Sequence, residues 1–350
     1  MDFLHFAFQF FHFNCSQWNE YNHQQQLTET DMAQLFESGR FAFRHLKIGG
    51  SFTFMEAQRH YEQIKEFEQK TGIQSIPFYS SKYPQVINKY ISPSQRPVFI
   101  NVRGGSELQE EKNVGIVGTR MPSVLGKNSA EIFTKYFCSL GLTIVSGLAY
   151  GIDTVAHQTS LPGRTVAVLG SGFSEIYPEI NTNLANSILE HQGLLISPFA
   201  ILESPMPYNF PKRNAIIAAL SAGILVVEGS EKSGAAITGK LALEMGKSVV
   251  TLSQDYRTAY GRGAIRLTES GATMVATEQE ALQVIFARFG GFSTKDSSSL
   301  TKSFSIDELR QSQQLSFPQA VQIIETAKHA GLIKKGLDGR WAKNSIKRDS

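Results

Sequence analysis

From residue 114 onward, hydrophobic positions come in short continuous runs separated by longer segments of helical periodicity. The runs are VGIVG, TIVSG, TVAVLGSG, LLISPF, GILVVEG, SVVTLS and ATMVA, and small or polar residues follow most of them. Continuous apolar runs of this kind are buried on both faces, which is typical of a parallel sheet covered by helices on both sides. Residues 114–289 are therefore predicted to form an α/β domain with a Rossmann-like, doubly wound parallel sheet.

The chain before this domain has a helical pattern. Residues 1–75 predict a small helical domain, with N-caps at Thr28 and Thr53. Residues 76–113 are punctuated by prolines and end in a strand-like run, VFINV, so we interpret them as a connector to the core.

The chain after the domain begins with a Gly/Ser-rich stretch, 290–303, which predicts a flexible linker. Residues 304–350 then give two helical segments, with Ser316 as an N-cap, and a hairpin-like IKKGLDGRWAK. Helix, helix and hairpin in this order predict a winged-helix-like domain. Its expected recognition helix has few basic residues, so a protein contact is at least as good an interpretation as DNA reading.

Composition narrows the class of protein only slightly. A length of 350 residues fits two or three domains, and a net charge of +3 neither demands nor excludes a nucleic-acid partner. Cys15 and Cys138 form no CxxC pair, and the histidines form no cluster with metal-ligand spacing, so we expect no disulfide framework and no metal. The Phe-rich start has no basic n-region and is shorter than the roughly 20 residues of a membrane helix. We therefore expect a cytoplasmic protein without a membrane partner or cofactor.

The first strand opens into a glycine-rich loop, VGIVGTRMPSVLG. This loop contains Gly118, Thr119, Arg120, Ser123 and Gly126. A strand that leads through such a loop into a helix is how many α/β proteins hold phosphate. The spacing departs from G-x-G-x-x-G, and the second strand ends in Ser146 and Gly147 without a carboxylate for a ribose, so NAD binding is disfavoured. Gly118 could equally serve only a tight strand-to-helix turn.

Similar loops recur in SGLAYGID, LGSGFSEIYP and EGSEKSGAAITGK, and basic residues accompany them. The carboxyl ends of parallel strands share one edge of a sheet, so four such loops would line one crevice. Guanidinium groups, lysines and helix N-termini all bind phosphate oxygens, and together they suit a phosphodiester backbone. Besides the first loop, the predicted nucleic-acid contacts are Ser146, Gly147, Lys212, Arg213, Asn214, Lys232, Ser233 and Gly234.

Catalytic patterns are weak in this sequence. Asp153 and His157 would share a helix face, but no serine or cysteine nucleophile stands in a recognisable elbow. We interpret Asp153 as a helix N-terminal group and His157 as a packing or hydrogen-bonding residue. Glu228 closes a strand and could act as an acid or base, or pair with Arg213. No catalytic residue is predicted.

The linked motifs resemble one known family. VGIVGTR, SGLAYGID-x-x-AH, TVAVLGSG-x-x-x-IYP-x-x-N, FP-x-RN-x-II, VVEG-x-x-x-SGAAIT and ESGATMV follow one another as in the DNA-processing protein family DprA/Smf. The resemblance implies a non-catalytic homodimer that binds incoming single-stranded DNA in natural transformation, protects it and loads the RecA recombinase. It assigns DNA contact to Arg120 and Lys232 first, and to Lys212 and Arg213 less strongly. Ser123 and Gly126 match its S-x-x-G loop positions.

Some positions depart from the family pattern, and alternatives stay open. Ala215 replaces an arginine, Gln254 and Ile265 stand in altered motifs, and Ser197-Pro198 replaces an expected Ser-Glu. One alternative is a nucleotide-binding Rossmann-like enzyme of the nucleoside monophosphate phosphoribohydrolase type, although SGAAITGKLALE lacks the Pro-Gly-Gly of such enzymes. Another is that the winged-helix-like unit is the main DNA binder.

Overall fold

The apolar runs of the sequence form the inner strands of a nine-stranded sheet with the order β1-β2-β6-β5-β4-β3-β7-β8-β9. The expected N-caps at Thr28 and Thr53 and nearly all of the expected linker, 290–303, lie outside the residues that the structure describes. This computed structural model describes residues 54–105, 110–161, 164–287, 303–329, 333–336 and 339–343.

Seven neighbouring strands, from β6 to β9 in this order, are parallel and match the seven predicted runs. The prediction of a Rossmann-like, doubly wound α/β fold is therefore confirmed. The bounds are β3 (Asn113–Val117), β4 (Thr143–Ser146), β5 (Thr165–Val168), β6 (Leu194–Ser197), β7 (Gly223–Val226), β8 (Ser248–Leu252) and β9 (Thr273–Val275).

Two further strands extend one edge of the sheet through antiparallel pairings. β1 (Gln74–Pro77) pairs with β2 (Phe99–Gly104), and β2 pairs with β6. The short helix α5 (Gln85–Tyr90) lies between them in the chain. Part of the segment 76–113, which the sequence assigns to a connector, thus belongs to the sheet, because β2 lies within it.

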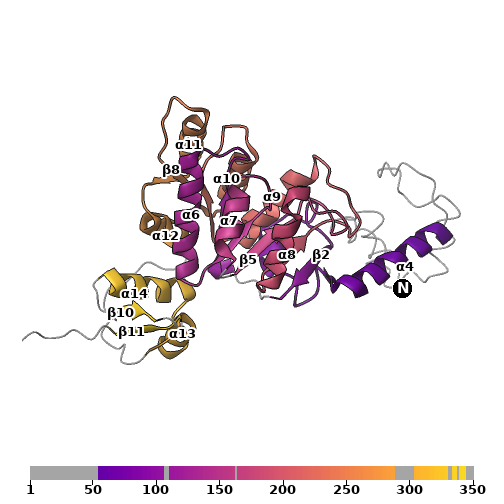
Figure 1. Cartoon of the computed structure of the whole chain (residues 1–350), viewed down its shortest axis with the longest axis horizontal. Helices are drawn as coiled ribbons and strands as arrows, with labels where there is room; N and C mark the ends of the chain where they lie inside the picture. The colour runs from indigo at the N-terminus through magenta and orange to yellow at the C-terminus, as the bar shows by residue number, and fades with distance from the viewer. Residues whose placement is uncertain are drawn as a thin grey trace, which may run out of the picture.

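Helices cover both faces of the sheet, as Figure 1 shows. Helices α5, α9, α10 and α11 pack on one face, and α6, α7, α8 and α12 pack on the other, where α4 joins α8 at the end near β6. Among the described helices, none has the length and apolarity that crossing a bilayer requires. The bounds are α4 (Phe54–Thr71), α6 (Val124–Ser139), α7 (Ile152–Ser160), α8 (Thr182–Glu190), α9 (Asn209–Leu220), α10 (Gly234–Glu244), α11 (Ala259–Glu269) and α12 (Glu278–Phe286).

Successive residues of the central strands point into different apolar layers, as the period of two in a strand requires. In β7, Ile224 and Val226 pack with α9 and α10, whereas Leu225 packs with α6 and α12. All three side chains are at most 1% exposed. Burial on both faces is the physical reason that the runs lack alternating polar residues.

The C-terminal residues form α13 (Ile306–Gln313), α14 (Phe317–His329), β10 (Ile333–Lys335) and β11 (Trp341–Lys343). This unit, yellow in Figure 1, lies against the end of α6. Phe317 belongs to the same apolar cluster as α6 and α12, and Lys112 Nζ lies 2.9 Å from Asp307 Oδ1. Ser316 accepts a hydrogen bond from the Gln319 N–H at 3.5 Å, as expected of an N-cap. The winged-helix assignment stays a prediction.

Candidate nucleic-acid interface

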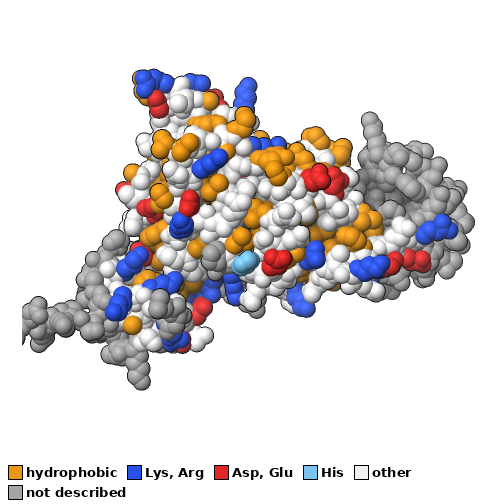
Figure 2. All heavy atoms as spheres, in the orientation of Figure 1, with side chains coloured by type: hydrophobic (Ala, Val, Ile, Leu, Met, Phe, Trp, Pro, Cys, Tyr) orange, Lys and Arg blue, Asp and Glu red, His pale blue; other side chains and the backbone are white. Residues whose placement is uncertain are grey.

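The order of the sheet reverses between β3 and β7, which are neighbours but lead to helices on opposite faces. Open α/β sheets commonly bind ligands at the carboxyl ends of strands beside such a reversal. The loops 118–123, 147–151 and 227–233 all begin at this edge. Figure 2 shows that Lys and Arg side chains gather at the end of the molecule where α6 and α11 begin, with a few Asp and Glu side chains among them, and that the face over α6, α7 and α8 also mixes basic and acidic side chains.

A carboxylate of the chain itself occupies the N-terminus of α6. The Ser123 N–H donates to Glu228 Oε2 at 2.9 Å, and Ser123 Oγ donates to Glu228 Oε1 at 2.6 Å. Ser123 Oγ also accepts from the Gly126 N–H at 2.9 Å, and a Cβ at Gly126 would collide with the Glu228 carboxyl group. Because helix N-termini favour negative charge, Glu228 fills the position that the sequence suggests for a DNA phosphate. Glu228 therefore pairs with this helix end and not with Arg213.

Two other predicted phosphate glycines also make room for groups of the protein. A Cβ at Gly118 would overlap the Ile152 side chain, and a Cβ at Gly147 would overlap the Arg213 guanidinium group. The Ile152 N–H donates to the Thr119 carbonyl at 3.2 Å, which joins the first two loops. Gly118 thus permits a close approach between the two loops, which is a packing role, and its service in a tight strand-to-helix turn stays a prediction.

Arg213 is a buried residue that ties α9 to two strand ends. It is 4% exposed and donates to the carbonyls of Gly147 and Val168, the latter at 2.9 Å. Ser146 is 0% exposed and donates to the Ile116 carbonyl at 2.6 Å. Neither side chain reaches the surface, so both have a structural role and neither is placed to contact a phosphate directly.

Asp153 closes the loop after β4 from inside. Its carboxylate accepts from the Gly147 N–H at 3.1 Å and from the Ala149 N–H at 3.4 Å, in the first turn of α7. Burial raises the pKa of Asp153, and the nearby Arg213 charge opposes this shift. Burial lowers the pKa of Arg213 to about 10, against the favourable effect of Asp153. This geometry agrees with the interpretation of Asp153 as a helix N-terminal group.

His157 lies behind the same loop and is 0% exposed. Its Nε2 accepts from the Leu148 N–H at 3.3 Å, and its Nδ1 is 2.8 Å from Thr165 Oγ1. Burial and the Arg213 charge lower the pKa of His157 to about 3, so the ring is neutral at ordinary pH. His157 is a hydrogen-bonding residue of the interior, as the sequence suggests.

The loop after β7 is open, in contrast to the loops after β3 and β4. Lys232 is exposed, and among the described residues it has no hydrogen-bond or ion-pair partner. Ser233 caps α10 by accepting from the Ala236 N–H at 3.1 Å. The nearest atom to a Cβ at Gly234 would be Asn214 Nδ2 at 3.8 Å, and Asn214 donates to the Gly234 carbonyl at 3.3 Å. The start of α10 therefore combines a free cation, exposed backbone and a fixed link to α9.

An aromatic platform lies between Arg120 and Arg213. The Phe210 ring centroid is 5.5 Å from Arg120 Cζ and 5.8 Å from Arg213 Cζ. Tyr177 packs beside this ring, with 5.6 Å between the two centroids. Arg120 is exposed, and aromatic rings and guanidinium planes are the groups on which unpaired bases stack. Sequence reasoning missed Phe210 and Tyr177, although the aromatic residues inside FPKRN and IYP offered a signal.

Lys212 leaves α9 on a different side from Phe210 and Arg213. It lines a separate pocket with Tyr208 and Pro211, and its Nζ is 5.5 Å from the centroid of the Tyr208 ring. The structure thus groups Arg120 with Phe210, and Lys232 with Asn214 and the start of α10, but it places Lys212 outside this group. Within the described residues, no three His, Cys, Asp or Glu side chains are arranged to hold a metal ion.

Comparison with known proteins identifies the family. Residues 74–286, more than half of the chain, match the family described as DNA recombination-mediator protein A. The chain belongs to this family. The match begins at β1, so it includes the two strands of the sheet that come before β3 in the chain.

Three relatives illustrate the relationship. The DNA processing protein DprA of Bacillus subtilis is 37% identical over 215 residues, which cover 61% of this chain and 71% of that protein. The crystal structure of DNA processing protein A from Streptococcus pneumoniae gives a TM-score of 0.58 at 28% identity, covering 77% of this chain and 90% of that one. The structure of DNA processing protein A from Helicobacter pylori gives a TM-score of 0.55 at 23% identity, covering 62% of this chain and 97% of that one. Both solved structures share the fold of this chain.

Proposed function

We propose that the chain binds single-stranded DNA along the carboxyl edge of its sheet, as part of its work as a recombination mediator. Arg120 and Lys232 supply the exposed positive charges, and Phe210 supplies a stacking surface beside Arg120. A phosphate chain with unpaired bases matches both kinds of group, whereas duplex bases are not free to stack on a side chain.

The observation that carries this proposal is the exposed Arg120 guanidinium group over the Phe210 ring of α9. Helix α9 also packs against α10, whose N-terminus no described carboxylate closes. DNA processing protein A from Helicobacter pylori shares this fold, and its structure describes a single-stranded DNA binding mode of that protein. As the family resemblance implies, we further propose that the bound strand is protected and passed to the RecA recombinase, and that the chain works as a homodimer without catalysing a reaction. The burial of Asp153 and His157 supports a non-catalytic role.

A double variant tests the site. We expect Arg120→Ala with Lys232→Ala to weaken binding of an oligo-dT strand at least tenfold. The slope of log affinity against log salt should fall by about 1.4, because each phosphate contact on a single strand releases roughly 0.7 counterions. Fluorescence anisotropy at several salt concentrations measures both quantities.

The matched control removes the same charges elsewhere. Arg164 is exposed before β5, at the amino edge of the sheet, and Lys82 is exposed in the turn before α5. Arg164→Ala with Lys82→Ala should keep wild-type affinity and slope. If the two double variants bind equally well, the carboxyl-edge site is wrong.

A further inference from the structure

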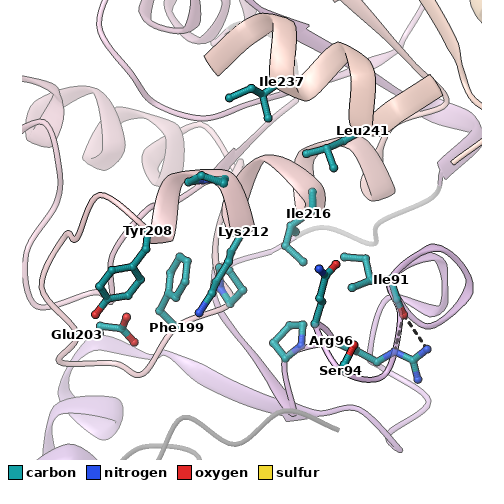
Figure 3. Close-up of a pocket in the computed structure, with 15 residues that line it drawn as sticks. Ile91, Ser94, Arg96, Phe199, Glu203, Tyr208, Lys212, Ile216, Ile237 and Leu241 are labelled. Atoms are coloured by element: carbon teal, nitrogen blue, oxygen red, sulfur yellow. Dashed lines mark hydrogen bonds between the residues drawn. The ribbon is translucent and has the colours of Figure 1, made fainter. Parts of the chain in front are cut away.

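A pocket of about 450 Å³ lies beside the proposed DNA site, on the other side of the first turn of α9. Figure 3 shows Lys212 extending from this turn beside Phe199, with Ile237 and Leu241 on α10 above and Ile91 and Arg96 at one end. Its volume falls in the range of roughly 300–1,000 Å³ that is usual for ligand pockets.

Of the charged side chains that line the pocket, Glu203 and Arg96 are hydrogen-bonded within the protein, and Lys212 is available to a ligand. Glu203 accepts hydrogen bonds from Asn209 Nδ2 at 2.8 Å and from the Ala200 N–H at 3.3 Å. Arg96 donates to the Asn88 carbonyl at 2.6 Å and to the Ile91 carbonyl at 2.9 Å, so its charge caps the end of α5. Lys212 has no hydrogen-bond or ion-pair partner among the described residues. A ligand should therefore have a negative group for Lys212.

The walls of the pocket define the rest of the ligand. Ile216, Ile237 and Leu241 form an aliphatic side, and Phe199 and Pro211 add flat faces. Ala215 also lines this pocket, at the position where the family pattern has arginine, so the small side chain leaves space that a long one would fill. A flat, largely apolar group attached to an anion fits this lining.

Single-stranded DNA offers such a group next to the proposed site. Phe210 and Arg213 face the carboxyl-edge loops, while Pro211 and Lys212, their chain neighbours, face the pocket. A strand that stacks on Phe210 therefore needs to cross only the first turn of α9 to reach the pocket. Its bases are unpaired and can turn away from the backbone, which duplex bases do only at the cost of unstacking.

We propose that this pocket receives one base of the bound strand and that Lys212 holds an adjoining phosphate. The inference rests on the proposed function and adds a selection for single strands, because a paired base does not enter a pocket. It also gives a role to Lys212, the lysine of the FPKRN motif, which points away from the predicted DNA contacts at the carboxyl edge of the sheet.

The test uses the shortest dT oligomer that binds, with one abasic position moved along it. For the wild type, we expect one position, beyond that stacked on Phe210, at which loss of the base weakens binding about tenfold, as for loss of a base–protein stack. Ile237 is 39% exposed, so Ile237→Trp can fill the pocket without entering the core. This variant should bind the intact oligomer about tenfold more weakly and should not respond to the abasic site at that position.

Two further variants make the result decisive. Ile132→Trp adds the same ring at an Ile that is 52% exposed on α6 and should behave as the wild type. Lys212→Met should lower the salt slope by about 0.7. If Ile237→Trp binds the intact oligomer as Ile132→Trp does and keeps the abasic response, the pocket proposal is wrong. If that happens while the Arg120 and Lys232 double variant loses binding, the proposed function survives without the pocket; if the double variant also binds normally, the proposed function fails by itself.

Discussion

The loops after β4 and β7 both join a buried strand to a helix and both contain glycine, yet the structure uses them differently. In the first, Asp153 accepts the N–H groups of Gly147 and Ala149 from inside the protein. In the second, α10 begins with Ser233 and an exposed Gly234, and no described carboxylate accepts from its N–H groups. The loop after β3 is closed too, by Glu228. A glycine-rich loop therefore indicates an anion site, but the anion can be a side chain of the protein.

The largest expected effect comes from breaking the closed loop after β4. Asp153→Asn keeps an oxygen for the two N–H groups but leaves the buried Arg213 without its nearby negative charge. We expect the free energy of unfolding to fall by about 3 kcal/mol, as for a buried charge that loses its counter-charge. Urea denaturation measures this loss. Asp255→Asn, at an exposed carboxylate that pairs with the exposed Arg257 in the loop before α11, should lower the midpoint much less, because an exposed ion pair contributes little. Similar midpoints for the two variants would contradict an electrostatic role for Asp153.

A pH titration sharpens the same comparison through His157. Its pKa in the folded protein is about 3, below the ordinary value of 6.5, so the unfolded chain takes up a proton first as the pH falls. The stability that the neutral ring provides is complete above pH 6.5 and is lost progressively towards pH 3, by about 1.4 kcal/mol per pH unit. The raised pKa of Asp153 acts in the opposite direction, so a difference between variants is the proper measurement.

His157→Gln removes this titration, and the free energy of unfolding should then depend less on pH between 6 and 4 than in the wild type, by roughly the slope given above. His191 is exposed on the surface, and His191→Gln should keep the wild-type slope. Equal slopes for the wild type and His157→Gln would show that the ring is not held neutral.

The smallest expected effect concerns the N-terminus of α6, which Glu228 closes to phosphate. Glu228→Gln removes the charge at this helix N-terminus while an amide oxygen can still accept from Ser123. We expect about 1 kcal/mol lower stability and three- to fivefold tighter oligo-dT binding at low salt, because the helix dipole becomes available to phosphate. Glu231→Gln, at an exposed residue in the loop after β7, removes the same formal charge. If Glu231→Gln gains as much affinity, net charge alone explains the effect.

The sequence predicted much of the fold because burial on both faces leaves a strong pattern. Each apolar run became a strand, and Ser316 became an N-cap. The antiparallel edge was less visible: β1 is only four residues long and includes Pro77, and a strand at a sheet edge needs no continuous apolar run. The exposed cations Arg120 and Lys232 were predicted correctly as exposed because both lie in loops. The burial of Arg213 could not be predicted in this way, because it depends on tertiary contacts of α9.

The sequence by itself determined the succession of core strands and helices along the chain, the edge of the sheet at which the loops gather and the presence of cations there. These features follow from hydrophobic period and chain connectivity. Only the tertiary structure decided which cations and N–H groups face solvent. Glu228 lies 105 residues from Ser123, and Arg213 lies 66 residues from Gly147. Hydrogen bonds over such separations depend on how strands are ordered in space, so no local pattern reveals that these groups already have partners.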